Sequence, residues 1–288
     1  SKPAWQRLII MVAGVVMNVI LAFLIYVGMS YKWGESYIST DGMVYGYVFN
    51  EVAQEMGFRD GDMILTVDGK SYDNYSELVE ALVIGQEYDV SLLRGGDTLK
   101  LYTPEMSVMR RMDPPDFIMP RFEFVVRETM EGGNAAKAGL QPGDKLVALN
   151  GQPMRFYDQY IKALPDHKLQ TVQLEVLRDS AGVAVPLFFD VDVTDEGTIG
   201  VGVDSSQIYA VKSIEYTFWQ SFPAGVRRVG SMISSYWNQL KLIVKPKSEM
   251  YKGLGGPLSI GNIFPAQWDW YQFWSFTALL SIILAVMN

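Results

Sequence analysis

The chain has 288 residues, enough for about two domains, and hydrophobic residues make up 49% of it. Its formal net charge of −8 argues against nucleic acid as a partner, because neutralising phosphates requires clustered lysine and arginine. There is no cysteine, which excludes a disulfide framework, a thiolate zinc site and a cysteine nucleophile. These features predict a folded protein that has a large apolar content and does not bind nucleic acid.

An uncharged apolar run extends from Leu8 to Tyr31. A bilayer core needs about 20 apolar helical residues, whereas the apolar part of a signal peptide has only about 7–15. The run therefore predicts a membrane-spanning helix. Within it, Asn18 lies near Ala13 and Gly14, and small residues beside an amide predict close packing against a neighbouring helix.

Flanking positive charge predicts the orientation of this helix. Lys2 and Arg7 precede it and Lys32 closely follows it, so we expect a cytoplasmic N-terminus and an extracytoplasmic middle region. A second apolar segment, residues 273–288, follows the cluster QWDWYQFW, and such aromatic clusters are typical of a membrane–water interface. We interpret this segment as the start of a membrane helix that runs back inward. Membrane lipid is therefore an expected partner.

The middle of the chain contains an internal repeat. Residues 57–82 (GFRDGDMILTVDGKSYDNYSELVEAL) align with residues 139–164 (GLQPGDKLVALNGQPMRFYDQYIKAL) at an offset of 82. In each copy a Gly-Asp turn leads into an alternating strand ending in Asp-Gly or Asn-Gly, dipeptides that favour tight hairpins. A short helix and another strand follow, so each copy predicts a small mixed α/β module. GTIGVGV, residues 197–203, predicts a short strand that closes the repeat region.

The segment after the repeats has helical periodicity. Between Val211 and Val244, apolar residues recur at helical spacing from Phe218 to Leu240, and Arg227 lies off that stripe. An amphipathic helix next to membrane spans is expected to lie in the membrane interface. The alternative is packing against a soluble domain. Gly-Gly-Pro within residues 253–265 then predicts a break before the second membrane helix.

Other catalytic chemistry finds little support in the sequence. A Ser-His-Asp triad could use only His167, and no Gly-x-Ser-x-Gly elbow precedes a helix. GLGGPLSIG has no lysine where a phosphate-binding loop requires one. DVDVTDEG lacks the ligand spacing of an EF-hand and predicts a polar loop. His167 is interpreted as an ordinary surface residue.

Two resemblances follow from these motifs. AAKAGLQPGDKLVALNG, residues 135–151, resembles the central signature of PDZ domains, which bind extended peptides by strand addition. Two such modules between membrane helices resemble the RseP-type site-2 proteases, which are intramembrane zinc metalloproteases. WQRLIIMVAGVVMNVILA resembles the second membrane helix of that family, although Val15 stands where proline is usual. GGPLSI, residues 255–260, resembles the Gly-Pro motif before the third helix, and LAVMN resembles the start of that helix's core motif.

The resemblance implies a zinc site that these residues do not complete. In the family, a His-Glu-x-x-His motif and a Leu-Asp-Gly aspartate supply the ligands and the general base, and this sequence contains neither. We therefore expect zinc in the full-length family, no zinc and no catalytic residue in this chain, and a fragment truncated at both ends. By family position, the residues expected to handle substrate near the active site are Asn18, Gly256, Pro257 and Asn288.

The predicted fold class is mixed, with membrane helices flanking two α+β PDZ-like domains. The predicted function is the central segment of a regulated intramembrane protease in a bacterial inner membrane, acting on transmembrane protein or peptide substrates. The PDZ pair, on the extracytoplasmic side, would gate their access. The alternative is a non-catalytic, membrane-anchored tandem-PDZ scaffold or adaptor. The predicted divisions are 1–34 for the first membrane helix, 35–120 and 121–204 for the PDZ-like domains, 205–268 for the amphipathic membrane-associated helix and Gly-Pro loop, and 269–288 for the start of the second membrane helix.

Overall fold

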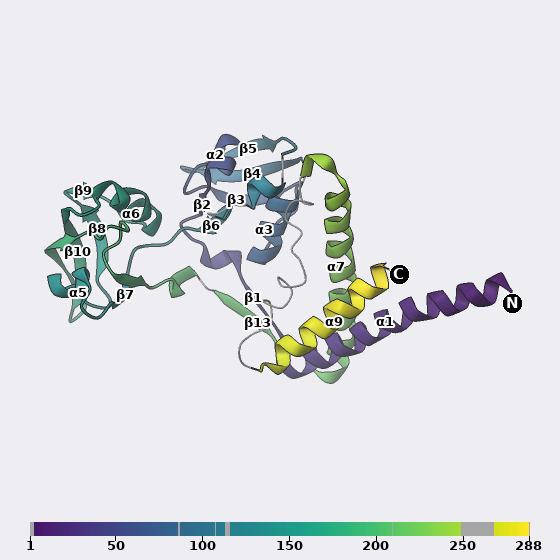
Figure 1. The fold of residues 1–288 in the computed structure, drawn as a ribbon. Coiled ribbons are helices and arrows are strands. Elements are labelled where there is room, and N and C mark those ends of the chain that lie inside the picture. The colour runs from purple at the N-terminus through teal and green to yellow at the C-terminus, as the bar shows by residue number, and fades with distance from the viewer. Residues whose placement is uncertain are drawn as a thin grey trace.

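The computed structural model describes residues 3–85, 87–106, 108–112, 116–208, 210–248 and 268–287. Long helices occupy both ends of this part of the chain, and two small β-rich modules lie between them in sequence (Figure 1). This arrangement confirms the predicted mixed fold. The side chains of residues 4–11 are not described, so statements about the first helix concern its later turns.

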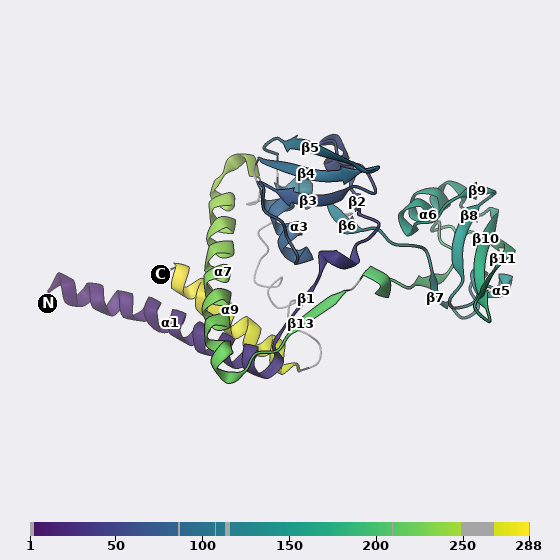
Figure 2. The same ribbon diagram turned by 180° about the vertical axis from the view of Figure 1, so that it is seen from behind.

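Among the residues that the structure describes, two helices are long and apolar enough to cross a membrane. They lie within α1 (Ala4–Trp33) and α9 (Trp270–Met287). Figures 1 and 2 show the two helices side by side, with α7 (Phe218–Val244) rising away from them toward the first module. The neighbour helix that Asn18 predicts is therefore present for α1.

A two-stranded antiparallel ribbon joins the helices to the modules. It pairs β1 (Glu35–Ile38) with β13 (Val211–Ile214). The helix predicted from residue 211 therefore begins later, at Phe218, because residues 211–214 pair with β1. Thr217 caps α7, and the Gln220 side chain accepts a hydrogen bond from the Thr217 backbone N–H at 3.0 Å.

The first module contains two small sheets around one core. Strands β3, β4 and β5 form one antiparallel sheet, and β2 pairs with β6. Asn50 and Asn74 cap α2 and α3 with their side-chain oxygens. The elements are β2 (Tyr47–Phe49), α2 (Glu51–Glu55), β3 (Met63–Val67), α3 (Tyr75–Ile84), β4 (Tyr88–Arg94), β5 (Asp97–Thr103), α4 (Val108–Arg111) and β6 (Ile118–Pro120), after a 3₁₀ turn at Thr40–Gly42.

The second module repeats this plan. Its first strand, β7, pairs with its last, β12, as β2 pairs with β6, and β11, β10, β8 and β9 form the larger sheet. The elements are β7 (Val126–Thr129), α5 (Asn134–Ala138), β8 (Lys145–Leu149), β9 (Gln152–Pro153), α6 (Tyr157–Ala163), β10 (Thr171–Ser180), β11 (Val183–Asp192) and β12 (Val201–Val203). Further 3₁₀ turns lie at Leu164–His167, Ser206–Ile208 and Pro246–Ser248.

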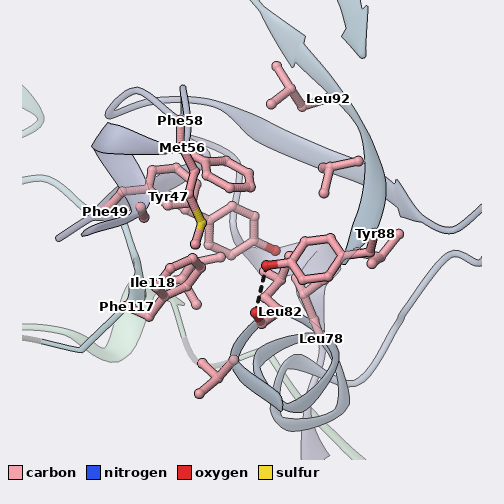
Figure 3. Close-up of a cluster of buried hydrophobic side chains, with 14 of the residues drawn as sticks. Tyr47, Phe49, Met56, Phe58, Leu78, Leu82, Tyr88, Leu92, Phe117 and Ile118 are labelled. Carbon is pink, nitrogen blue, oxygen red and sulfur yellow. Dashed lines mark hydrogen bonds between the residues drawn. The ribbon is translucent and has the colours of Figure 1, made fainter. Parts of the chain in front are cut away.

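The core of the first module is rich in aromatic side chains (Figure 3). The rings of Phe49 and Phe58 stack with their centroids 4.8 Å apart. Tyr88 is buried as well, and its hydroxyl donates to the Leu82 carbonyl at 2.6 Å, which satisfies the polar end of the ring. Burial of each such side chain contributes about 1.5–3 kcal/mol, so this module has a core of its own.

The predicted hairpin turns are confirmed in both modules. Asp68 and Gly69 have φ values of 50° and 75°, and Asn150 and Gly151 have values of 49° and 77°. Two consecutive residues with positive φ are what a type I′ turn requires, and Asp-Gly and Asn-Gly adopt it at low cost. The turns therefore fix the strand registers of the two modules in the same way.

Both modules also share an ion pair that the repeat alignment does not single out. Asp62 is 1% exposed, and its Oδ1 lies 2.7 Å from Arg94 Nε. Asp144 is fully buried, and its Oδ1 lies 2.6 Å from Arg178 Nε. Each pair holds the Gly-Asp turn against the end of the following long strand, and the hydrogen bond to Asp62 raises the pKa of Arg94.

Candidate functional site

The structure describes one of the four predicted substrate-handling residues. Asn18 lies half-buried in α1, directly before Val19, whose side chain packs against the helix cluster. Gly256, Pro257 and Asn288 lie outside the described residues. That the four residues lie together at one site therefore stays a prediction.

Three helices meet at a close-packed junction. The junction depends on Gly225 of α7, because a Cβ atom there would come within 2.6 Å of Val27 Cγ2 and 3.2 Å of the Val27 nitrogen. Small residues thus allow α7 to approach the backbone of α1. The buried cluster comprises Ala22, Ile25, Tyr26 and Met29 of α1, Val229 of α7, and Ala278 and Ile282 of α9.

Aromatic and basic side chains surround this junction. Arg228 of α7 donates to the Tyr271 hydroxyl at 3.1 Å, and its guanidinium lies 4.9 Å from the centre of the Tyr26 ring. The rings of Trp33 and Tyr271 meet edge to face, with centroids 5.8 Å apart. Such a rim is typical of the level where helices leave a membrane. Further exposed aromatic residues lie just before α9 and in its first turns: Trp268, Trp270, Phe273 and Trp274.

The described residues do not fit a catalytic zinc site. Among them, no group of three or more His, Cys, Asp or Glu side chains is placed to hold a metal ion. His167 lies half-buried in the second module, with its Nδ1 3.4 Å from Gln170 Oε1. A catalytic zinc site uses about three protein ligands. No catalytic step is therefore assigned to these residues.

The ribbon is fastened to the first module by a network around Asp73. Asp73 accepts hydrogen bonds from Ser39 Oγ at 2.5 Å, Tyr37 Oη at 2.7 Å and Lys212 Nζ at 2.9 Å. These donors, Ser39 first, lower the pKa of Asp73 to about 2. Lys212 also pairs with Asp41 at 2.8 Å, and the two carboxylates raise the pKa of Lys212. The network ties both ribbon strands to the loop before α3.

The far end of α7 is fastened to the same module. Ser235 Oγ lies 2.9 Å from Glu80 Oε1 of α3, and Leu242 is 4% exposed within the aromatic core. Lys247 Nζ then pairs with Glu105 at 2.9 Å. A cleft of about 730 Å³ separates α3 from α7 beside these contacts. The helix therefore packs on the first module, which is the alternative left open by the sequence, and its association with the membrane surface stays a prediction.

The two modules meet through a polar contact. Arg121, directly after β6, pairs with Asp158 of α6 at 3.1 Å, and its guanidinium lies 4.0 Å from the Phe156 ring centre. Lys162 pairs with Asp60 at 2.5 Å. Among the described residues, the second module is thus connected to helices α1, α7 and α9 through the first module and the ribbon.

Sequence reasoning missed these fastening residues. The carboxylates and lysines resemble ordinary surface charges, because their partners lie far away in sequence: Lys212 is 139 residues from Asp73. One signal was available for Leu242, since it follows the apolar stripe of α7. Nothing in the sequence indicated which surface that stripe would contact.

The comparisons with known proteins cover the whole chain. The model of peptidase family M50 matches residues 1–288. "Regulator of sigma-E protease RseP" of Salmonella typhimurium is 26% identical over all of this chain and 68% of its own length. A protein of Xylella fastidiosa named "Putative zinc metalloprotease" is 24% identical over all of this chain and 67% of its own length.

The chain thus spans about two thirds of the length of these relatives. The match extends through both apolar helices and both modules, so it does not depend on a single motif. It confirms the family resemblance found in the residues, and the chain belongs to peptidase family M50.

Proposed function

We propose that this chain is the central, substrate-selecting part of an intramembrane zinc metalloprotease in a bacterial inner membrane. Its substrates would be transmembrane proteins of the anti-sigma-factor or remnant-signal-peptide type. Family membership over residues 1–288 is the observation that carries the proposal. The zinc ligands would come from parts of the protein beyond these residues, because the sequence has one histidine and no cysteine.

The module pair would restrict access to the helices. Two separate connections support this role, since the ribbon and α7 both fix the first module relative to α1 and α9. A module held in place at two points can exclude a bulky folded domain, whereas one on a flexible linker would move aside. The second module would extend this barrier through the Arg121–Asp158 contact.

The experiment uses membrane vesicles that contain the complete gene product. A single-span reporter protein without its extracytoplasmic domain is co-expressed, so that the same vesicles contain both proteins. Release of the reporter's cytoplasmic tag is followed by gel electrophoresis. We expect cleavage that stops with a zinc chelator and returns with added zinc. Cleavage that continues at the same rate in the presence of the chelator would contradict the proposal. Absence of any cleavage, together with a gene that lacks His-Glu-x-x-His, would favour the membrane-anchored scaffold instead.

A further inference from the structure

An apolar groove runs along the last turns of α1, where α9 lies beside it (Figure 1). Its volume is about 380 Å³, and of the residues that line it only Lys32 is charged. The lining residues are Leu24, Ile25, Gly28, Met29, Lys32 and Trp33 of α1 and Trp274 of α9. The proposed proteolytic function makes no use of this groove.

Gly28 leaves the middle of the groove open. A Cβ atom on Gly28 would meet no side chain and no other element within 4 Å, so the missing side chain makes a gap in the surface of the helix. Behind the gap, Ile25 and Met29 are buried in the same cluster as Ala278 and Ile282 of α9. This part of the helix surface is therefore concave and has a packed floor, which suits the binding of a narrow apolar group.

The wall that α9 contributes is held in place by two contacts. Tyr271 lies one turn before Trp274, on the same side of α9. Its hydroxyl accepts a hydrogen bond from Arg228 at 3.1 Å, and its ring meets the Trp33 ring edge to face. The groove is thus formed in the absence of a ligand, which lowers the entropy cost of binding.

The groove has the length and depth of one membrane leaflet. The apolar window of α1 runs from Val12 to Trp33 and has 22 residues, which at about 1.5 Å per residue is close to the ~30 Å of a bilayer core. Leu24 and Lys32 are about 12 Å apart along the helix axis. Lys32 and Trp33 therefore lie at the membrane surface nearer the modules, and Leu24 lies near the bilayer centre. A phospholipid acyl chain occupies this depth.

The charge at the surface end of the groove indicates a phosphate. Among the carboxylates that the structure describes, none forms an ion pair with Lys32, and nearby Glu35 instead accepts a hydrogen bond from the Tyr216 hydroxyl at 2.9 Å. The Lys32 ammonium lies 5.0 Å from the centre of the Trp33 ring, within the aromatic rim. One lysine at a membrane surface favours an anionic over a zwitterionic lipid by about fivefold.

From these observations we propose that the groove between α1 and α9 binds one anionic phospholipid, with an acyl chain along Gly28 and the phosphate against Lys32. The inference goes beyond the proposed function, and it holds whether or not the complete protein cleaves a substrate. The competing occupant is a further helix of the complete gene product, because this chain spans only about two thirds of the length of its relatives. The experiment separates the two.

The test uses the complete gene product in phosphatidylcholine vesicles. Two probes are compared at the same mole fraction, a phosphatidylglycerol and a phosphatidylcholine that carry the same photoreactive diazirine in one acyl chain, and the labelled residues are mapped by mass spectrometry. We expect about fivefold more labelling of residues 24–29 by the phosphatidylglycerol probe, and equal labelling of residues 12–21 by both. Equal labelling at 24–29 would overturn the proposal in favour of bulk lipid contact. Absence of labelling there would show that another helix covers the groove.

Two pairs of variants identify the groups responsible. Gly28→Leu fills the groove and should reduce the labelling of residues 24–29 by the phosphatidylglycerol probe at least fivefold. Gly230→Leu is its control, because Gly230 is also a helical glycine with open space around its Cβ. Lys32→Gln should abolish the preference for phosphatidylglycerol, whereas the exposed control Lys100→Gln loses the same charge and should keep it. Unchanged labelling in Gly28→Leu or Lys32→Gln, or an equal loss in either control, would contradict the assigned site.

Discussion

Asp62 and Asp144 occupy the same position in the two repeats, and each is almost completely removed from water. Their carboxylates accept backbone N–H bonds from Arg59 and Gln141 as well as contacting arginine. A buried carboxylate that loses its cation keeps the desolvation cost without the compensating attraction. These aspartates therefore make each Gly-Asp turn dependent on a strand that begins about 25 or more residues later in sequence.

Removing the arginine should destabilise one module at a time. Arg94→Met should lower the free energy of unfolding of the first module by about 3 kcal/mol, and Arg178→Met should do the same to the second. Hydrogen exchange of strands β4 and β10 measures both effects in one sample. Arg127→Met is the matched control, because Arg127 and Glu128 are both over 60% exposed at the side chain and their pair should contribute under about 1 kcal/mol. An equal loss of stability in the Arg94→Met, Arg178→Met and Arg127→Met variants would contradict this account.

The Asp73 network should respond to acid in a defined range. A carboxylate with a pKa lowered to about 2 contributes stability that is present above its unfolded pKa of about 4. That contribution is lost as the pH falls from about 4 through 2. Carbon NMR titration of the Asp73 carboxyl should show the low midpoint, and Lys212→Met should move it up toward the ordinary value. An unshifted midpoint in the wild-type chain would show that the network does not form.

At the residue scale, the sequence repeat predicted the turns of the two modules better than it predicted which side chains contact one another. Gly61 and Gly143 were aligned from sequence, and both have positive φ, as the Gly-Asp turn requires. Arg94 and Arg178 end the corresponding strands EYDVSLLR and TVQLEVLR of the two modules, yet an arginine at a strand end usually faces water. Tyr75 and Tyr157 align as well, but one binds a carbonyl and the other stacks on a ring. Identical residues thus took different roles because their neighbours differ.

At the scale of elements, α7 illustrates what periodicity can and cannot predict. Its apolar stripe predicted a helix, and the helix exists from Phe218 to Val244. The same stripe contacts two different partners, the membrane-type helices near Gly225 and the first module near Leu242. Residues 211–214 form a strand because β1, 173 or more residues away in sequence, offers a free edge. Such distant pairings carry little local signal.

Two glycines of α7 should respond oppositely to alanine. Gly225→Ala should destabilise the helix junction by about 1–3 kcal/mol, because the added methyl group meets the backbone of Val27. Gly230→Ala has open space around its Cβ and should stabilise the helix by about 0.8 kcal/mol through propensity alone. Thermal unfolding of the chain in detergent, followed by circular dichroism, should show midpoints shifted in opposite directions. A lower midpoint for both variants would contradict the assigned packing.

At the scale of the whole molecule, the first module is held to the helices at two points and carries the second module outward (Figure 2). Under the proposed function, this arrangement would form a barrier between the extracytoplasmic space and the membrane helices. Its rigidity depends on Leu242, whose side chain enters the core of the first module. Introducing a charge there should release the helix, because an unpaired buried carboxylate is strongly unfavourable.

The most direct test of this account is a cleavage assay on the complete gene product in membrane vesicles. Two reporters are compared, one with a folded extracytoplasmic domain and one without, for the wild type, Leu242→Asp and the exposed control Val244→Asp. We predict that the wild type and Val244→Asp cleave only the trimmed reporter, whereas Leu242→Asp cleaves both. Equal cleavage of both reporters by the wild type, or an unchanged preference in Leu242→Asp, would contradict a fixed module pair that controls access.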